Sequence, residues 1–186
     1  MCIMLAVFMG KVLKKKTAVA GDEVTYSLML RQMQKAAAIQ HKGIASRHAY
    51  SMDGIDYYCG IRDEDIGILR QKYDVIILDI SFENTFDNTN VTFARMVSRL
   101  SACDEKILAG SMLPWKSREC EKKMERIERF LDIRGFKMVT LAACDKEAVS
   151  IIKKHGVEVV LIPFERNPFV ISGENLRSFL ELLKIT

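Results

Sequence analysis

An aspartate at the end of an apolar run is well placed, by residue type and spacing, to do chemistry. Asp79 follows Val75–Leu78, a stretch typical of a strand buried on both faces. In open parallel sheets, ligands lie beyond the carboxyl ends of the strands, where a carboxylate can hold Mg²⁺ or its water shell. An aspartate there can equally cap the following loop. Asp79 therefore indicates either a metal-assisted phosphate site or the loop cap of an α/β fold.

A phosphate site of this kind also needs a glycine-rich loop after another strand. The apolar run Thr17–Gly21 ends in a glycine and precedes a predicted helix. A loop of the form GxxxxGK[ST] places a glycine, a lysine and a hydroxyl five to seven positions after its first glycine. Counted from Gly21, these positions hold Tyr26, Ser27 and Leu28. The sequence therefore lacks the glycine, lysine and hydroxyl that a functional phosphate loop has at these positions.

The same turn offers two hydroxyls with two interpretations. Thr25 and Ser27 could present hydroxyls, together with free amides of a helix start, to a small anion. Helix N-capping explains both residues with less assumption. Asp22 and Glu23 place negative charge where phosphates would lie, and no lysine stands beside them. At most a vestigial nucleotide site is expected, formed by Gly21, Thr25, Ser27 and Asp79.

The other chemically versatile side chains show no catalytic or metal-ligand spacing. His41, His48 and His155 are far apart in sequence, and His155 before Gly156 suits a helix C-terminus. We therefore assign no catalytic residue, and no metal ligand beyond Asp79. Trp115 after Pro114 is interpreted as an anchor at a strand-to-helix turn or as an aromatic contact for a partner protein.

Cysteine usage and composition indicate a single soluble globular domain. The five cysteines form no CxxC pair, so they are interpreted as reduced thiols of a cytoplasmic protein. A chain of 186 residues with 49% hydrophobic content can bury a substantial core. The net charge of +4 is well short of the concentrated basic face of a dedicated nucleic-acid binder.

The first 16 residues are expected to be an apolar and basic extension to the domain formed by residues 17–186. The apolar run Cys2–Met9 is too short to span a bilayer. It is predicted to be an edge strand or a weak membrane-surface anchor, unless translation begins at Met9. The basic residues that follow could touch anionic lipid at the inner face of the membrane, or nucleic acid: Lys11, Lys14, Lys15 and Lys16.

Apolar runs of strand length alternate with helical patterns along the chain. This alternation predicts an α/β fold with a doubly wound, mostly parallel sheet and helices on both faces, a three-layer sandwich of the Rossmann or P-loop NTPase type. Helices are expected at Val24–Gln40, at Lys116–Arg134 and near the end of the chain, around Leu176–Leu183. The expected strands are Thr17–Gly21, Gly43–Tyr50, Asp74–Ile80, Lys106–Met112, Phe136–Ala143 and Val157–Pro163.

The order of these segments resembles the ParA/MinD class of P-loop ATPases. The resemblance rests on the runs Thr17–Gly21, Tyr73–Asp79, Lys106–Ser111 and Leu161–Phe164, and it spans most of the chain from about Lys16 onward. It is strongest to divergent CpaE-like members associated with tight-adherence (Tad) pilus assembly. In that family the first loop carries a lysine and the strand aspartate contacts the metal. Gly21 and Asp79 match that pattern, whereas Tyr26, Ser27 and Leu28 depart from it.

The resemblance implies a protein that pairs with a second copy and recruits protein partners, such as pilus or secretion components. Combined with the missing loop residues, it predicts a pseudo-ATPase without a cofactor that acts as an interaction or scaffolding module. One alternative is an ATPase that binds ATP and Mg²⁺ at a non-standard phosphate site, using Thr25, Ser27 and Asp79 with a lysine from Lys14–Lys16 or from a second subunit. Another is a receiver-like regulatory domain, in which Asp79 would be phosphorylated.

Overall fold

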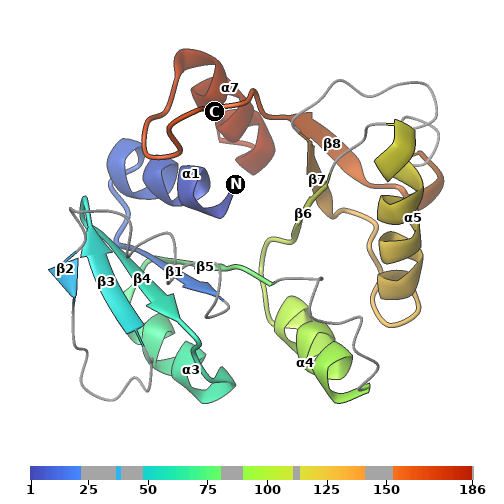
Figure 1. Ribbon diagram of the computed structural model, residues 1–186, viewed down its shortest axis with the longest axis horizontal. Helices are drawn as coiled ribbons and strands as arrows, with labels where there is room; N and C mark the ends of the chain where they lie inside the picture. The colour runs from blue at the N-terminus through green and yellow to red at the C-terminus, as the bar shows by residue number, and fades with distance from the viewer. Residues whose placement is uncertain (22–36, 39–47, 81–89, 111–113, 141–152, 186) are drawn as a thin grey trace. The chain divides into compact units, whose positions relative to one another are not determined.

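The computed structural model describes residues 1–21, 37–38, 48–80, 90–110, 114–140 and 153–185 (Figure 1). The chain divides into two compact units. The first unit comprises Met1–Thr89 and Asn167–Ile171, and the second comprises Asn90–Arg166 and Ser172–Thr186. Each unit contains a sheet of its own. The predicted division into a 16-residue extension and one domain stays a prediction.

Among the described residues, the sheet of the first unit has five strands in the order β2-β3-β4-β1-β5. The central strand β1 runs parallel to both β4 and β5, and all five of its residues are buried. Strand β3 is antiparallel to β4, and β2 is antiparallel to β3. The strands are β1 (Thr17–Gly21), β2 (Ala37–Ala38), β3 (His48–Met52), β4 (Ile55–Cys59) and β5 (Val75–Leu78).

Strands β3 and β4 form a hairpin closed by two residues. Asp53 and Gly54 have φ angles of 55° and 77°, and Met52 pairs with Ile55 across the turn. Two consecutive positive φ angles are the mark of a type I′ turn, which favours Asp-Gly because its twist matches that of the strands. The hairpin was not predicted from the sequence.

Described helices cover both faces of the β1 region. Ala18 and Ala20 pack with Leu69 of α3 (Asp63–Lys72) on one face. Residues alternate in a strand, so Thr17 and Val19 point to the opposite face, where Thr17 lies close to Gly10. Gly10 belongs to the π-helical turn η1 (Phe8–Val12), and Figure 1 shows α1 and α3 on opposite sides of the sheet.

The N-terminal segment is a helix, so its prediction as an edge strand is wrong. Helix α1 (Cys2–Val7) contacts β1 and β5, and Ile3–Val7 are buried, as is Phe8 in η1. Burial of this apolar helix against the sheet removes much hydrocarbon from water, at about 25 cal/mol for each Å². That gain favours packing on the sheet over pairing as an edge strand.

In the described part of the second unit, three parallel strands form a sheet in the order β6-β7-β8. Its core includes Met124 and Ile127 of α5, Met138 of β7, and Phe179 and Leu182 of α7. The elements are α4 (Asn90–Ser101), β6 (Ile107–Ala109), α5 (Pro114–Glu128), β7 (Lys137–Thr140), β8 (Glu158–Leu161) and α7 (Gly173–Leu183).

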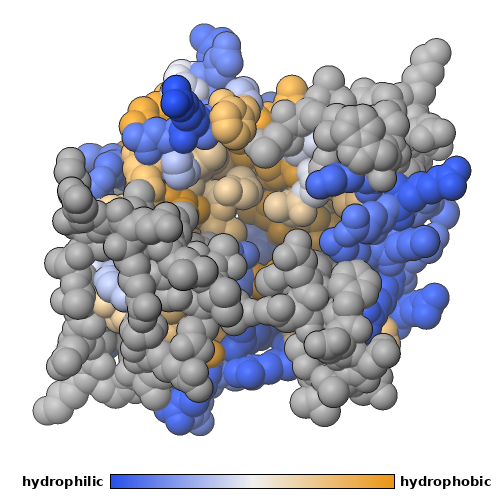
Figure 2. All heavy atoms as spheres, in the orientation of Figure 1, coloured by the Kyte–Doolittle hydropathy of each residue, from blue (hydrophilic) through white to orange (hydrophobic). Residues whose placement is uncertain are grey.

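Helix α5 is amphipathic, and it overlaps the helix predicted at Lys116–Arg134. Met124 and Ile127 are buried, while Glu119 and Lys123 form an i,i+4 ion pair, with Oε1 and Nζ 2.9 Å apart. Figure 2 shows hydrophilic side chains gathered over this helix. The helix ends at Glu128, earlier than the predicted Arg134.

Five of the six predicted strands overlap observed strands along most of the observed length, and Gly43–Tyr50 meets β3 only at its end. The predicted helix Val24–Gln40 lies outside the described residues except at Ala37–Ala38, which form β2, so its C-terminal end is wrong. Strand β4 and helices α3 and α4 were not predicted. Among the described residues, no helix is both long enough and apolar enough to cross a membrane.

Candidate functional site

The candidate site lies at the carboxyl ends of the parallel strands β4, β1 and β5. Gly21 pairs with Cys59 in register, and Ala20 pairs with Leu78. The backbone N–H of Asp79 donates to the carbonyl of Ala20 over 2.8 Å, which continues the ladder one residue beyond β5. Asp79 and Gly21 therefore stand side by side where the two strands end.

The neighbouring strand closes the other side of this edge. The N–H of Gly60 donates to the carbonyl of Gly21 over 2.9 Å. Gly60 has a φ of 68°, which lets the chain turn away immediately after β4. Gly21 is buried between its two neighbours, whereas Asp79 is half-buried. This edge is where an α/β sheet binds a ligand.

Of the four predicted nucleotide-site residues, the structure brings together Gly21 and Asp79. Thr25 and Ser27, together with Asp22 and Glu23, lie outside the described residues. The carboxylate of Asp79 could hold a hydrated cation through one oxygen, as Mg²⁺ is often held. Mg²⁺ is usually held by one or two carboxylates together with the phosphates of a substrate. A triphosphate also needs positive charge from the protein.

The basic residues before β1 stand at the other end of that strand. Lys16 directly precedes Thr17, so its backbone is separated from Gly21 by about 16 Å of extended chain. Its N–H donates to Asp74 over 2.8 Å, and its ammonium lies 5.3 Å from the centre of the Tyr73 ring. Lys11 Nζ is 2.6 Å from Asp53 at the β3–β4 turn. Lys11 and Lys16 therefore have partners away from the carboxyl edge.

A buried tyrosine network lies on the face of this sheet that packs against α3. The Tyr73 hydroxyl donates to Asp56 over 2.5 Å and lies 2.6 Å from the Tyr58 hydroxyl. Burial raises the pKa of Tyr58 to about 12, and burial with the bond to Asp56 raises the pKa of Tyr73 well above its usual range. Both phenols are thus neutral near pH 7. The network is suited to fixing the strand–helix packing and unsuited to nucleophilic attack.

The remaining predicted residues are spread over the chain. Trp115 is in the first turn of α5, but its side chain is outside the described residues, as are His41 and the side chain of His48. His155 ends a short helical turn before Gly156, as predicted. Burial raises the pKa of the Cys120 thiol, which makes that residue a poor nucleophile.

Comparison with families and curated proteins gave no match to a family model or to a curated sequence. Among solved structures, the MinD cell division protein of Aquifex aeolicus matches with a TM-score of 0.64 and 12% identity, covering 100% of this chain and 92% of that chain. MinD in the MinC:MinD cell division complex of the same organism matches at 0.59 and 14%, covering 99% and 91%. A plasmid partition protein from Borrelia burgdorferi matches at 0.53 and 12%, covering 99% and 89%.

At these identities, the likeness establishes the fold. The chain has the α/β fold of MinD and of the plasmid partition protein, so the predicted fold class is confirmed. The similar structures also belong to the class of proteins that the sequence order resembles.

Proposed function

We propose that this chain is a degenerate member of the ParA/MinD class, which hydrolyses no nucleotide and acts as a protein-interaction module. One observation carries the proposal. Gly21 and Asp79 are adjacent at the carboxyl edge of the sheet, but Tyr26, Ser27 and Leu28 stand at the positions where a phosphate loop has its glycine, lysine and hydroxyl. We infer that the fold of a nucleotide-dependent switch is present without the residues that bind a triphosphate.

Electrostatics supports this proposal. Asp22 and Glu23 follow Gly21 directly, and Asp79 lies beside it. At an effective dielectric constant of 20, two unit charges of the same sign 4 Å apart repel each other by about 4 kcal/mol. A triphosphate would meet this repulsion without a lysine from the same loop. A cation at Asp79 could offset part of it.

An interaction role fits the apolar surface of the second unit. Among the described residues, Phe164 is 75% exposed and Leu161 is 47% exposed. A partner that covered these side chains would gain hydrophobic stabilisation. One of the similar structures is a complex of MinD with MinC, so a protein of this fold does bind a protein partner. The CpaE-like sequence order points to a partner in pilus or secretion assembly.

Calorimetric titration with Mg-ATP and a phosphate-release assay test the proposal. We expect neither micromolar binding nor turnover by the unaltered chain. A triple variant, Tyr26→Gly with Ser27→Lys and Leu28→Thr, restores the GxxxxGK[ST] pattern counted from Gly21. This variant should gain measurable ATP affinity, because Gly21 and Asp79 are already in place.

Adding Asp79→Asn to the restored chain provides the control. This change removes a metal-binding charge while keeping the shape of the side chain, so it should weaken the gained affinity and leave the circular dichroism spectrum unchanged. Micromolar binding with turnover by the unaltered chain would contradict the proposal and support an ATPase with a non-standard phosphate site.

A further inference from the structure

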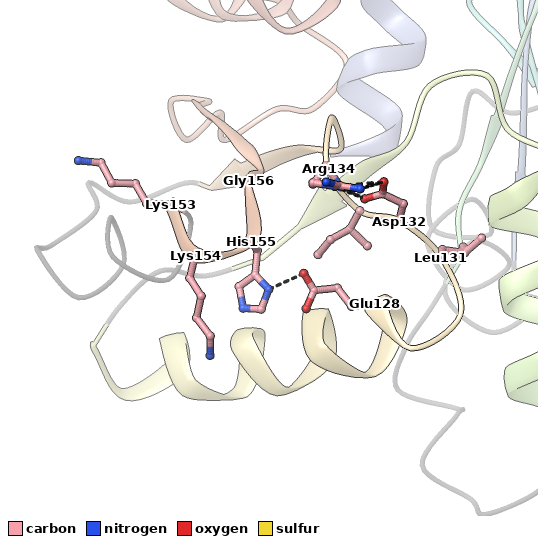
Figure 3. A pocket seen from close by; sticks show the side chains of 9 residues that line it. Glu128, Leu131, Asp132, Arg134, Lys153, Lys154, His155 and Gly156 are labelled. Carbon is pink, nitrogen blue, oxygen red and sulfur yellow. Dashed lines mark hydrogen bonds and ion pairs between the residues drawn. The ribbon is translucent and has the colours of Figure 1, made fainter.

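Three glutamates on α5 face a histidine from a different part of the second unit. Glu121, Glu125 and Glu128 are spaced by four and three positions, which places them along one face of the helix. His155 reaches this face from the helical turn at residues 153–155, which precedes β8. Its Nδ1 lies 2.8 Å from Oε1 of Glu128 (Figure 3).

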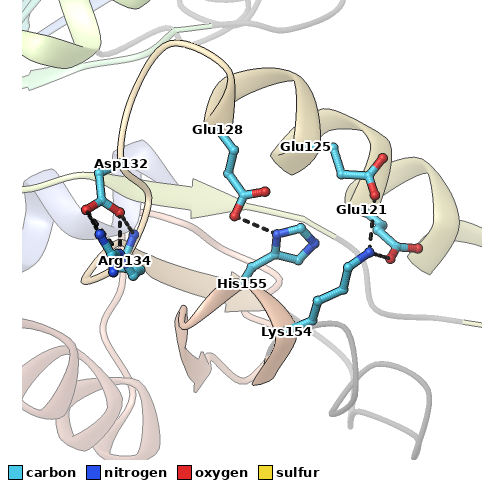
Figure 4. Close-up of polar contacts among 7 residues, drawn as sticks. All are labelled: Glu121, Glu125, Glu128, Asp132, Arg134, Lys154 and His155. Atoms are coloured by element: carbon cyan, nitrogen blue, oxygen red, sulfur yellow. Dashed lines mark hydrogen bonds and ion pairs between the residues drawn. The ribbon is translucent and has the colours of Figure 1, made fainter.

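The other ring nitrogen of His155 is buried without a partner. The side chain is only 2% exposed, and Nε2 makes no hydrogen bond within the described part of the chain. A buried polar atom left unsatisfied is costly and calls for an explanation. Figure 4 shows the ring edge opposite Glu128 facing the carboxylates of Glu121 and Glu125. One ligand atom from each of Glu121, Glu125 and His155 lies within 4.8 Å of the other two.

The carboxylates of Glu121 and Glu125 already form ion pairs with a lysine side chain. Lys154 Nζ is 3.1 Å from Glu121 and 3.3 Å from Glu125, and these carboxylates raise the pKa of Lys154. The lysine side chain is 59% exposed, so it can swing into water at little cost. An exposed ion pair of this kind contributes little to stability. A metal ion can therefore displace it.

We propose that Glu121, Glu125 and Nε2 of His155 form a binding site for a divalent transition-metal ion, with zinc as the best match. Imidazole and carboxylate together form a common donor set for zinc. Glu128 accepts the Nδ1–H of His155, which leaves the lone pair of Nε2 directed at the ion. This carboxylate–histidine–metal arrangement is the usual outer support of such sites.

Zinc binding requires the three ligand atoms to move only slightly closer together. Ligand atoms about 2.0–2.1 Å from a tetrahedral zinc ion lie roughly 3.4 Å from one another. The present separations of up to 4.8 Å therefore close by about an ångström or a little more. Glu125 is 45% exposed and can change its rotamer freely. Water would supply the fourth ligand, and the ion would tie α5 to the segment that leads into β8.

Titration of the whole chain with Zn²⁺ by calorimetry, and with Co²⁺ by visible absorption, tests the site. We expect one ion per chain. The double variant Glu121→Gln with Glu125→Gln should weaken binding at least 100-fold, and Glu128→Gln should weaken it about 10- to 100-fold. Lys154→Gln should tighten binding several-fold, because the competing ammonium is gone. Bound zinc should also raise the melting temperature.

Glu119→Gln is the matched control, because Glu119 lies on the same helix and pairs with Lys123 outside the cluster. It should leave zinc affinity unchanged. The changed glutamates are surface groups of α5, so the variants should fold, which circular dichroism checks. Equal affinity in all variants, a thiolate charge-transfer band in the cobalt spectrum, or no binding even by Lys154→Gln would each overturn the proposal. None of these outcomes depends on whether the chain binds a nucleotide.

Discussion

At the residue scale, Gly110 shows how closely the second unit is packed. A Cβ added there would lie 2.7 Å from Cε of Met138 and 2.9 Å from Sγ of Cys120. Met138 is fully buried, so its methyl group has little room to retreat. Overpacking of a dense core costs about 1–3 kcal/mol. We therefore expect Gly110→Ala to lower the free energy of unfolding by about 1–2 kcal/mol, measured by urea denaturation.

The same substitution by alanine at Gly67 should have the opposite effect on stability. It lies inside α3, and an added Cβ would meet nothing within 4 Å. Alanine is the better helix former by about 0.5–1 kcal/mol, so Gly67→Ala should raise the free energy of unfolding. If both substitutions shifted stability in the same direction, close packing at Gly110 would not be the cause.

At the element scale, the β3–β4 hairpin depends on the backbone of its two turn residues. Gly54 has a φ of 77° and nothing within 4 Å of an added Cβ, so the cost of a side chain there comes from the backbone alone. An L-residue in the left-handed region costs about 1–2 kcal/mol. Gly54→Ala should therefore destabilise the protein by about that amount in urea denaturation.

Asp53→Asn separates the turn from the ion pair that Asp53 makes with Lys11. Asparagine suits a type I′ turn as well as aspartate does, and an exposed ion pair contributes at most about 1 kcal/mol. This variant should stay within about 1 kcal/mol of the parent chain. A larger loss for Asp53→Asn than for Gly54→Ala would show that the charge, and not the turn, holds the hairpin.

The strands that were predicted along most of their length coincide with largely apolar runs in the sequence. Val75–Leu78 is such a run, and β5 was found there. Strand β4 was missed because Asp56 and its tyrosines look polar, although Tyr57 and Tyr58 are buried. The Asp53-Gly54 turn signal beside it could have revealed the hairpin. Helix α4 carried a signal too, in the helical spacing of its buried apolar residues Phe93, Met96 and Leu100.

The carboxyl edge of the first sheet and the glutamate–histidine cluster on α5 also differ in how far the sequence predicts them. Gly21 and Asp79 follow adjacent parallel strands, so the pairing rule alone places them together. His155 and Glu128 are separated by 27 positions, and their contact depends on how α5 packs beside the turn before β8. Single-sequence spacing contains no information about that packing. The cluster on α5 became visible only in three dimensions.

At the scale of the whole molecule, stability against pH is set by groups whose pKa differs between the folded and unfolded states. Burial raises the pKa of Tyr57, Tyr58 and Tyr73 above the ordinary value of 10.0, and that of Tyr58 reaches about 12. Below pH 10 these phenols are protonated in both states, and their contribution is complete. Between pH 10 and 12 the unfolded chain releases its protons first, so stability falls as the pH rises.

Phenylalanine substitutions test this alkaline loss. Each proton involved can change the free energy of unfolding by at most about 1.4 kcal/mol per pH unit. Tyr57→Phe and Tyr73→Phe should each make the decline between pH 10 and 12 shallower in denaturant titrations.

At pH 7 the two variants should differ in stability. Tyr73→Phe loses hydrogen bonds to Asp56 and Tyr58, which should lower the free energy of unfolding by about 1–2 kcal/mol. Tyr57→Phe removes a buried hydroxyl that has no partner in the described part of the chain, and should cost nothing. Unchanged alkaline slopes in both variants would show that other groups cause the decline.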